Sequence, residues 1–196
     1  MKKYLEKSDT ILGIDGGTNI LYANKIKPDL IIGDMDSIDK SILDYFKKET
    51  EVAIYPSKKD ETDTELGLNW CLENNKKDVV IFNSMQNRLD HIQGLIANLI
   101  FAYKKGLNLE IVNQKQKIFI AQNMSFSTKK GVNISLIPLT EVVEGISTDG
   151  LEYPLNNENL FFYHSRGISN VALKNEVKIT HKKGLLMIIV SEKDVI

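Results

Sequence analysis

The N-terminal part of the chain alternates short apolar runs with longer segments of helical periodicity, and this alternation restricts the fold more than any other feature. Up to about residue 122, the expected strands are Thr10–Ile14, Leu30–Ile32, Val52–Tyr55, Val79–Phe82 and Leu109–Val112. The helices expected between them are Ile38–Lys48, Thr64–Leu72 and His91–Lys104. Such alternation is typical of a mostly parallel sheet with helices on its faces. We therefore predict an α/β domain over residues 1–122.

The pattern changes after Gln122, where short β-rich segments are separated by turn residues. These segments are Val132–Leu136, Leu160–Phe162, Val177–Thr180 and Leu185–Val190. They favour a small antiparallel sandwich or barrel. The predicted fold class is thus α/β, with an N-terminal mostly parallel sheet and flanking helices, followed by a smaller all-β domain over residues 123–196.

Composition restricts the partners of the chain. Its 196 residues include 25 basic and 26 acidic side chains, so no strong overall field favours nucleic acid or an anionic membrane. The single cysteine, Cys71, excludes an intramolecular disulfide and is expected on the apolar face of a helix. No leader-like apolar segment follows the start, and no run of about 18 apolar residues occurs. We expect a cytoplasmic protein that recognises small molecules locally.

Acidic residues follow three successive expected strands. The segments are Gly33-Asp34-Met35-Asp36-Ser37, Lys59-Asp60-Glu61-Thr62-Asp63 and Arg88-Leu89-Asp90-His91. Open α/β sheets bind ligands at the carboxyl ends of their strands. The sequence therefore predicts one site that combines five aspartates with Lys59 and Arg88.

Five neighbouring carboxylates require a counter-charge, and magnesium prefers such hard oxygen ligands. The basic residues beside them suit phosphate oxygens, which a metal ion would also bridge. The combination of acids, Lys59 and Arg88 therefore indicates magnesium-dependent phosphoryl transfer.

Several of these residues also fit purely structural roles. Thr62 with Glu65 matches a helix capping box, Asp63 and Asp90 stand where helix caps occur, and Asp39 is expected to cap the helix that follows it. Asp34 and Asp36 fit a turn as well as a ligand site.

Two further elements also have two interpretations. Asp15-Gly16-Gly17 closes the first expected strand, where its glycines either let the backbone approach a phosphate or adenine ring or only serve a turn with positive φ. His91 fits either a general base or a residue that hydrogen-bonds the backbone at a helix start.

Taken together, these segments resemble the thiamine pyrophosphokinase family. The resemblance is carried by Asp15-Gly16-Gly17 with Asn19, Pro28-Asp29 running through Ser37, Lys59-Asp60 with Thr62-Asp63, and Arg88-Leu89-Asp90-His91 with Asn98. In the second domain it is carried by Gly150-Leu151-Glu152-Tyr153-Pro154-Leu155 and Gly167-Ile168-Ser169-Asn170.

The resemblance implies transfer of pyrophosphate from ATP to the hydroxyl of thiamine, in a homodimer whose active sites lie between subunits. It implies that magnesium is held by Asp34, Asp36, Asp60 and Asp63, and that the catalytic residues are Asp36, Asp60, Asp63 and Asp90. The implied ATP-binding residues are Asp15, Gly16, Gly17, Asp34, Ser37, Lys59, Arg88 and His91. Ser169 and Asn170 would contact thiamine. Either Asp90 or Asp36 would accept the hydroxyl proton.

The chain departs from the family pattern at three points. A strand with a glycine-containing turn usually precedes the Asp15-Gly16-Gly17 strand, which here is expected to begin at Thr10, and Gln86-Asn87 and Val171 replace a Gly-Gly pair and a glutamate. We expect the lack of this strand to weaken ATP binding more than thiamine binding, and the side chains of Gln86-Asn87 to crowd a ligand that would otherwise meet bare backbone. Two alternatives stay open: a weakly active or inactive relative that binds nucleotide or thiamine, and a magnesium-dependent kinase of another small alcohol.

Overall fold

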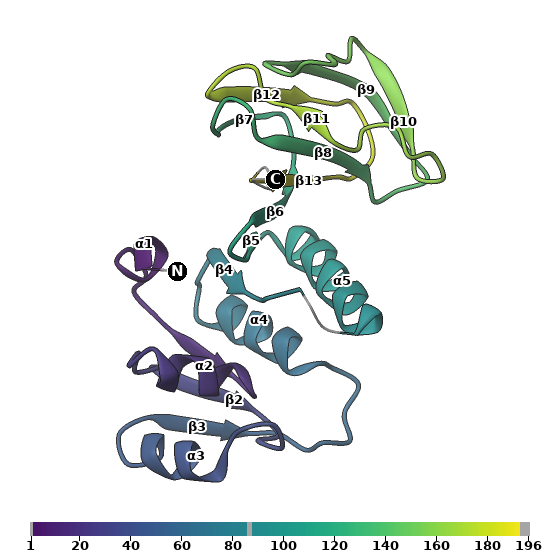
Figure 1. The fold of residues 1–196 in the computed structure, drawn as a ribbon. Coiled ribbons are helices and arrows are strands. Elements are labelled where there is room, and N and C mark those ends of the chain that lie inside the picture. Colours follow the sequence, from purple (N-terminus) through teal and green to yellow (C-terminus); the bar gives the residue numbers. More distant parts are fainter. Residues whose placement is uncertain (1, 86–87, 193–196) are drawn as a thin grey trace. The chain divides into compact units, whose positions relative to one another are not determined.

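The computed structural model describes residues 2–85 and 88–192 (Figure 1). The chain forms two compact units. The first, here called the α/β unit, comprises Met1–Val79 and Leu89–Leu107. The second, the all-β unit, comprises Val80–Arg88 and Asn108–Ile196. Among the described residues, no helix is both long and apolar enough to cross a membrane.

The α/β unit contains a three-stranded parallel sheet. Its strands are β1 (Leu12–Ile14), β2 (Leu30–Gly33) and β3 (Glu51–Ile54), in that spatial order. Its helices are α1 (Lys2–Leu5), α2 (Gly17–Ala23), α3 (Lys40–Phe46), α4 (Asp63–Glu73) and α5 (Leu89–Lys105). Every residue of the central strand β2 is buried, which agrees with its continuous apolar sequence.

The helices of this unit follow the apolar periodicity of the sequence. In α5 the buried residues recur at steps of three and four positions, at Leu95, Leu99 and Ala102. In α4 the buried face includes Cys71, as expected, and burial raises the pKa of its thiol.

The all-β unit consists of two sheets. One has the order β10 (Glu158–Phe161), β9 (Val142–Asp149), β12 (Glu176–Thr180) and β7 (Met124–Ser127). The other has the order β11 (Asn170–Val171), β8 (Asn133–Pro138), β13 (Leu186–Ser191), β6 (Gln116–Ala121), β5 (Asn108–Val112) and β4 (Asp78–Phe82). One apolar core joins side chains of both sheets, for example Ile146 and Ile179 of the first with Ile134 and Ile188 of the second. The unit is therefore a sandwich.

The parallel sheet holds three of the five strands expected before residue 122. Strand β5 pairs with β6 in antiparallel register, and β4 lies beside β5. The turn between β5 and β6 explains this pairing, because the side-chain oxygen of Asn113 accepts hydrogen bonds from the N–H groups of Lys115 and Gln116. The apolar pattern of a strand predicts that the strand is buried, but it does not determine which strand pairs with it.

Gly167 offers a test of the packing in the all-β unit. It has φ +101°, and a Cβ at this position would lie 2.5 Å from the carbonyl oxygen of Leu136. Gly131 is a matched control, because it has φ +93° with no atom within 4 Å of such a Cβ. We expect Gly167→Ala to lower the free energy of unfolding by about 3 kcal/mol, and Gly131→Ala by about 1 kcal/mol. Urea denaturation followed by circular dichroism measures both; equal losses would show that only φ matters.

Candidate active site

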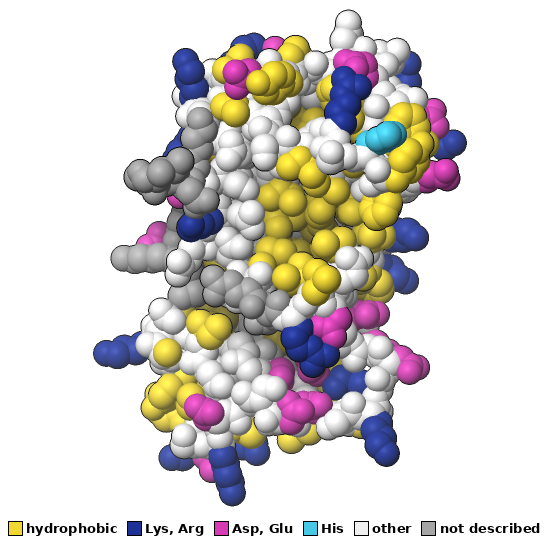
Figure 2. Space-filling view, turned by 45° about the vertical axis from the view of Figure 1, so that its right-hand side comes forward, with side chains coloured by type: hydrophobic (Ala, Val, Ile, Leu, Met, Phe, Trp, Pro, Cys, Tyr) yellow, Lys and Arg dark blue, Asp and Glu magenta, His cyan; other side chains and the backbone are white. Residues whose placement is uncertain are grey.

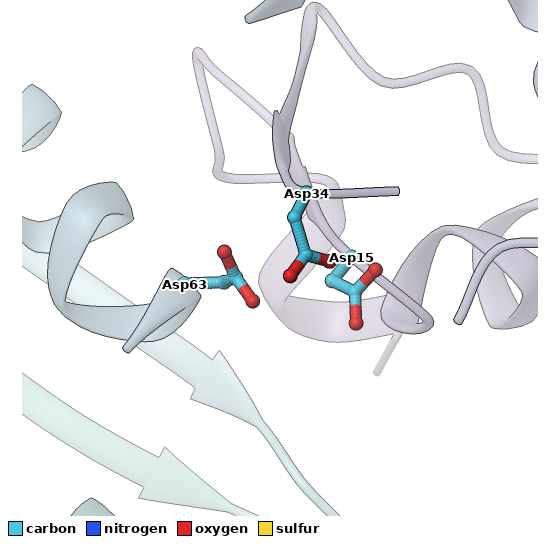
Figure 3. A group of neighbouring side chains, drawn as sticks. All are labelled: Asp15, Asp34 and Asp63. Carbon is cyan, nitrogen blue, oxygen red and sulfur yellow. The ribbon is translucent and has the colours of Figure 1, made fainter. Parts of the chain in front are cut away.

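Three carboxylates converge in the α/β unit. Asp15 follows β1, Asp34 follows β2, and Asp63 is the first residue of α4. One oxygen of each carboxylate lies within 4.8 Å of the others, and all three residues are partly buried. Asp63 extends from the helix start toward the other two aspartates (Figure 3). We call these residues the three-carboxylate group.

The backbone brings Asp15 and Asp34 together. The N–H of Asp15 donates to the carbonyl of Ile32 at 2.9 Å, which continues the pairing of β1 with β2. Gly33 has φ +150°, and a Cβ there would lie 3.0 Å from Cβ of Asp15. Glycine is therefore required where the second strand passes the aspartate that ends the first.

The start of α4 directs Asp63 toward the strand ends. The hydroxyl of Thr62 accepts a hydrogen bond from the N–H of Glu65 at 3.2 Å, which confirms Thr62 as the N-cap. One turn further on, a Cβ at Gly67 would lie 2.7 Å from Cδ1 of Ile14, so this face of the helix lies close against β1. Residues one turn apart share a helix face, and Asp63 therefore points to the carboxyl end of that strand.

A lysine lies between two of the carboxylates. Nζ of Lys59 is 3.0 Å from Oδ1 of Asp63 and 3.9 Å from Oδ2 of Asp34, and it donates to the carbonyl of Pro56 at 3.1 Å. Only 12% of the Lys59 side chain is exposed. Within the described part of the chain, the buried Oδ1 of Asp63 accepts no hydrogen bond of good geometry, so its contact with Lys59 is an ion pair only.

The surroundings of Asp34 favour its charged form. The N–H of Asp36 donates to Oδ1 of Asp34 at 3.2 Å, and this bond, followed by the side chain of Ser57 and the charge of Lys59, holds the pKa of Asp34 below its ordinary value. Asp34 therefore carries a negative charge at neutral pH and can act as a hard ligand.

A polar layer lies beside the three-carboxylate group. The hydroxyl of Ser37 donates to Oδ1 of Asp36 at 2.7 Å, and the N–H of Ser37 is 3.4 Å from Oδ1 of Asp15. A Cβ at Gly16 would lie 3.1 Å from Cβ of Ser37, so this turn allows close contact. The amide of Asn19 donates to the carbonyl of Ser37 at 3.0 Å. Asn19 thus holds the loop that carries Asp36.

The expected cap at Asp39 needs a correction. Asp39 occupies the N-cap position of α3, but its side chain makes no capping hydrogen bond. Instead, its own N–H donates to Oδ1 of Asn19 at 3.1 Å. The side chain that orders this turn therefore comes from α2, and its only signal in the sequence is the Asn that closely follows Asp15-Gly16-Gly17.

Other predicted residues are not members of the three-carboxylate group. Asp36 and Asp60 are exposed and are not among its members. Asp90 and His91 are exposed in the first turn of α5, where the N–H of His91 donates to Oδ1 of Asp90 at 2.9 Å.

The remaining predicted ATP-binding positions lie elsewhere in the chain. Arg88 is exposed and belongs to the all-β unit. The Gln86-Asn87 pair lies outside the described residues, and Gly17 is exposed at the start of α2.

In the all-β unit, Asn170 joins the two segments that resemble the family. Its Oδ1 accepts from the N–H of Tyr153 at 3.0 Å, and its Nδ2 donates to the carbonyl of Tyr153 at 2.7 Å. The side chain is buried. Ser169 has φ +59°, and its N–H donates to the hydroxyl of Ser135 at 3.0 Å. Asn170 therefore shapes the backbone here, while Ser169 is exposed.

A shallow cleft of about 300 Å³ lies beside Ile168, which precedes Ser169 in the chain. Its walls are Leu136, Ile137, Pro138, Phe162, Tyr163, His164, Ser165, Arg166 and Ile168. The rings of Tyr163 and His164 are 4.7 Å apart, and Arg166 forms an ion pair with Glu158. Exposed hydrophobic side chains are visible on this unit (Figure 2). Aromatic side chains thus form part of the wall of this cleft.

The chain is thus a two-domain protein, with converging carboxylates in the α/β unit and a cleft with aromatic walls in the all-β unit. The family model described as thiamin pyrophosphokinase, catalytic domain, matches residues 1–111, and the model described as thiamin pyrophosphokinase, vitamin B1 binding domain, matches residues 115–186. The chain therefore belongs to the thiamin pyrophosphokinase family.

Individual relatives agree with this membership. A thiamine pyrophosphokinase from Bacillus subtilis is 29% identical over 190 residues, which cover 95% of this chain and 89% of the relative. The crystal structure of a Bacillus subtilis thiamine pyrophosphokinase matches with a TM-score of 0.84 and 27% identity, over 93% of this chain and 87% of the other. Thiamin pyrophosphokinase from Candida albicans, 18% identical, has the same fold with a TM-score of 0.80, over 95% and 83% of the two chains. The predicted resemblance and fold class are confirmed.

The pKa of Asp34 predicts a pH dependence of stability. Because the pKa lies below 3.8 in the folded protein, the ionised carboxylate stabilises the fold above that pH, and this stabilisation is lost as the pH falls through the folded value. We expect Asp34→Asn to melt below the wild type at neutral pH, and the difference to shrink on acidification. Thermal melts in metal-free buffers measure it. A difference that grows in acid would contradict the assignment.

Proposed function

We propose that this chain transfers pyrophosphate from ATP to the hydroxyl of thiamine, with magnesium bound at the three-carboxylate group. The products are thiamine diphosphate and AMP. The observation that carries the proposal is that a chain matching both domains of the family has converging carboxylates and a lysine at the strand ends of its catalytic domain. ATP and magnesium are assigned to residues 1–122 and thiamine to residues 123–196.

The chemistry of the group suits magnesium. Opposite ligands of an octahedral magnesium ion are about 4.2 Å apart, because each bond is about 2.1 Å long. The carboxylate oxygens already lie within 4.8 Å of one another, so small side-chain rotations would suffice. Asp15, Asp34 and Asp63 would hold the ion, and Asp36 and Asp60 stay as predicted ligands from the flanking loops. When bound, magnesium neutralises charge on phosphate oxygens.

The residues around the group have proposed roles in binding ATP. Gly16 and Gly17 would let the backbone approach a phosphate at the start of α2, beside Ser37. Lys59, Arg88 and His91 would contact phosphate oxygens as donors. The proton of the attacking hydroxyl would pass to Asp90 or Asp36, both of which are exposed carboxylates.

Thiamine is assigned to the cleft beside Ile168. Thiamine is an aromatic cation, and the faces of Phe162 and Tyr163 would attract it. The charge of Arg166, also in the cleft, is compensated by Glu158. Asn170 would act by positioning Ser169 and Tyr153, since its side chain is engaged with the backbone of Tyr153.

A homodimer in the cytoplasm completes the proposal. The all-β unit exposes several large apolar side chains, namely Tyr153, Phe162, Tyr163, Ile168 and Leu173. Symmetric association would remove such surface from water and bring a second copy to the substrate. The cytoplasmic assignment is supported by the single buried thiol.

The reaction can be tested by resolving its products. With thiamine, ATP and magnesium, we expect thiamine diphosphate and AMP to form in equal amounts, as measured by chromatography. Asp63→Asn should lower kcat/KM at least about a hundredfold, because it removes a charged ligand at nearly constant volume. Asp60→Asn should cost less, since Asp60 is exposed and outside the group.

The same assay separates the alternatives. ADP as the product, or turnover of another small alcohol in place of thiamine, would indicate a different kinase. Ligand binding without turnover would indicate an inactive relative. Full activity in Asp63→Asn would place the metal elsewhere.

The cleft makes a separate prediction for thiamine. Tyr163→Ala should raise the KM for thiamine about fivefold to tenfold through loss of ring contacts, and leave the KM for ATP unchanged. The side chain is 68% exposed, so the melting temperature should hardly change. Tyr45→Ala, which removes a 57% exposed tyrosine from α3, is the control. An unchanged KM for thiamine in Tyr163→Ala would exclude the cleft.

A further inference from the structure

Lys59 already occupies the position of a cation within the three-carboxylate group. Its ammonium is 3.0 Å from Asp63 and 3.9 Å from Asp34, carboxylates that come from a helix start and a strand end. Its third contact, with the carbonyl of Pro56, links it to the loop after β3. With 12% of its side chain exposed, this lysine is held by its partners rather than extended into solvent.

This arrangement has an electrostatic reason. Three carboxylates within 4.8 Å repel one another, and only partial contact with water screens them. A single ammonium offsets part of that repulsion. A divalent ion would offset more. Oδ1 of Asp34 already accepts from the N–H of Asp36, and Oδ2 of Asp34 and Oδ1 of Asp63 face the ammonium, so an ion that binds these two carboxylates meets the ammonium as a competitor.

We propose that Lys59 is an exchangeable counter-cation, which neutralises Asp34 and Asp63 without metal and competes with the metal ion for their oxygens. This inference rests on the proposed metal site. The four-carbon stem of lysine allows the ammonium to move while the loop stays in place. Metal binding therefore displaces the ammonium from the carboxylates and makes it available to a phosphate oxygen. No covalent step is involved.

A lysine that competes with the metal ion and a lysine that only organises the ligands have opposite effects on the affinity for the ion when the ammonium is removed. Removal of the ammonium leaves a more negative group, so a divalent ion should bind more tightly. If Lys59 only preorganised Asp34 and Asp63, its removal would weaken metal binding. The sign of the change in metal affinity thus distinguishes the two roles.

Calorimetric titration of the metal-free full chain with Mn²⁺ tests the proposal. Lys59→Met, which keeps the apolar stem, should bind Mn²⁺ about tenfold more tightly than the wild type. Without metal it should melt at a lower temperature, and saturating Mn²⁺ should raise its melting temperature more than that of the wild type. Lys58→Met is the control, because Lys58 is exposed at the neighbouring position and should leave both values unchanged.

Two results of the Mn²⁺ titration would contradict the proposed role of Lys59. Weaker or unchanged Mn²⁺ binding in Lys59→Met, with normal binding by the wild type, would overturn this inference alone. Absence of Mn²⁺ binding in the wild type would overturn the proposed metal site and this inference with it. If Lys59→Met does not fold, Lys59→Gln, which can still donate to the carbonyl of Pro56, should show the same tighter binding, and Lys59→Arg should resemble the wild type.

Discussion

The close passage of β2 past the end of β1 is the constraint on which the candidate site depends. Gly33 has φ +150° and a Cβ there would lie 3.0 Å from Cβ of Asp15, so a side chain at this position would be strained, and the backbone of Asp15 bonds to Ile32. Two acidic side chains are thereby brought together at one sheet edge. Their repulsion must be offset, and Lys59 and the N–H of Asp36 provide part of that compensation.

The third carboxylate depends on helix packing rather than strand pairing. Gly67 allows α4 to approach Ile14, and Thr62 starts the helix so that Asp63 lies one turn before that contact. Packing in the hydrophobic core and ligand geometry are thus linked through one helix face. A bulky residue in place of Gly67 would have to displace the Ile14 side chain or the helix.

In the all-β unit, a buried amide fixes the arrangement of two segments. Asn170 of β11 bonds to both backbone polar groups of Tyr153, so the strand and the loop that carries Tyr153 keep one arrangement. A buried amide that bonds to the backbone through both its oxygen and its nitrogen can thus be needed for the local fold of this segment.

The sequence by itself indicated the alternation of strands and helices, a β-rich C-terminal part, and the family, because apolar periodicity and motif spacing are local properties. It also indicated acidic residues at the ends of strands. Only the tertiary structure decided that β4 and β5 join the sandwich, that Asp15 rather than Asp36 or Asp60 lies with Asp34 and Asp63, and that Asn19 orders the start of α3. These outcomes depend on which backbones lie side by side, and in particular on the space left by Gly33 and Gly67. Contacts of this kind are made between residues far apart in the chain, which is why no local pattern records them.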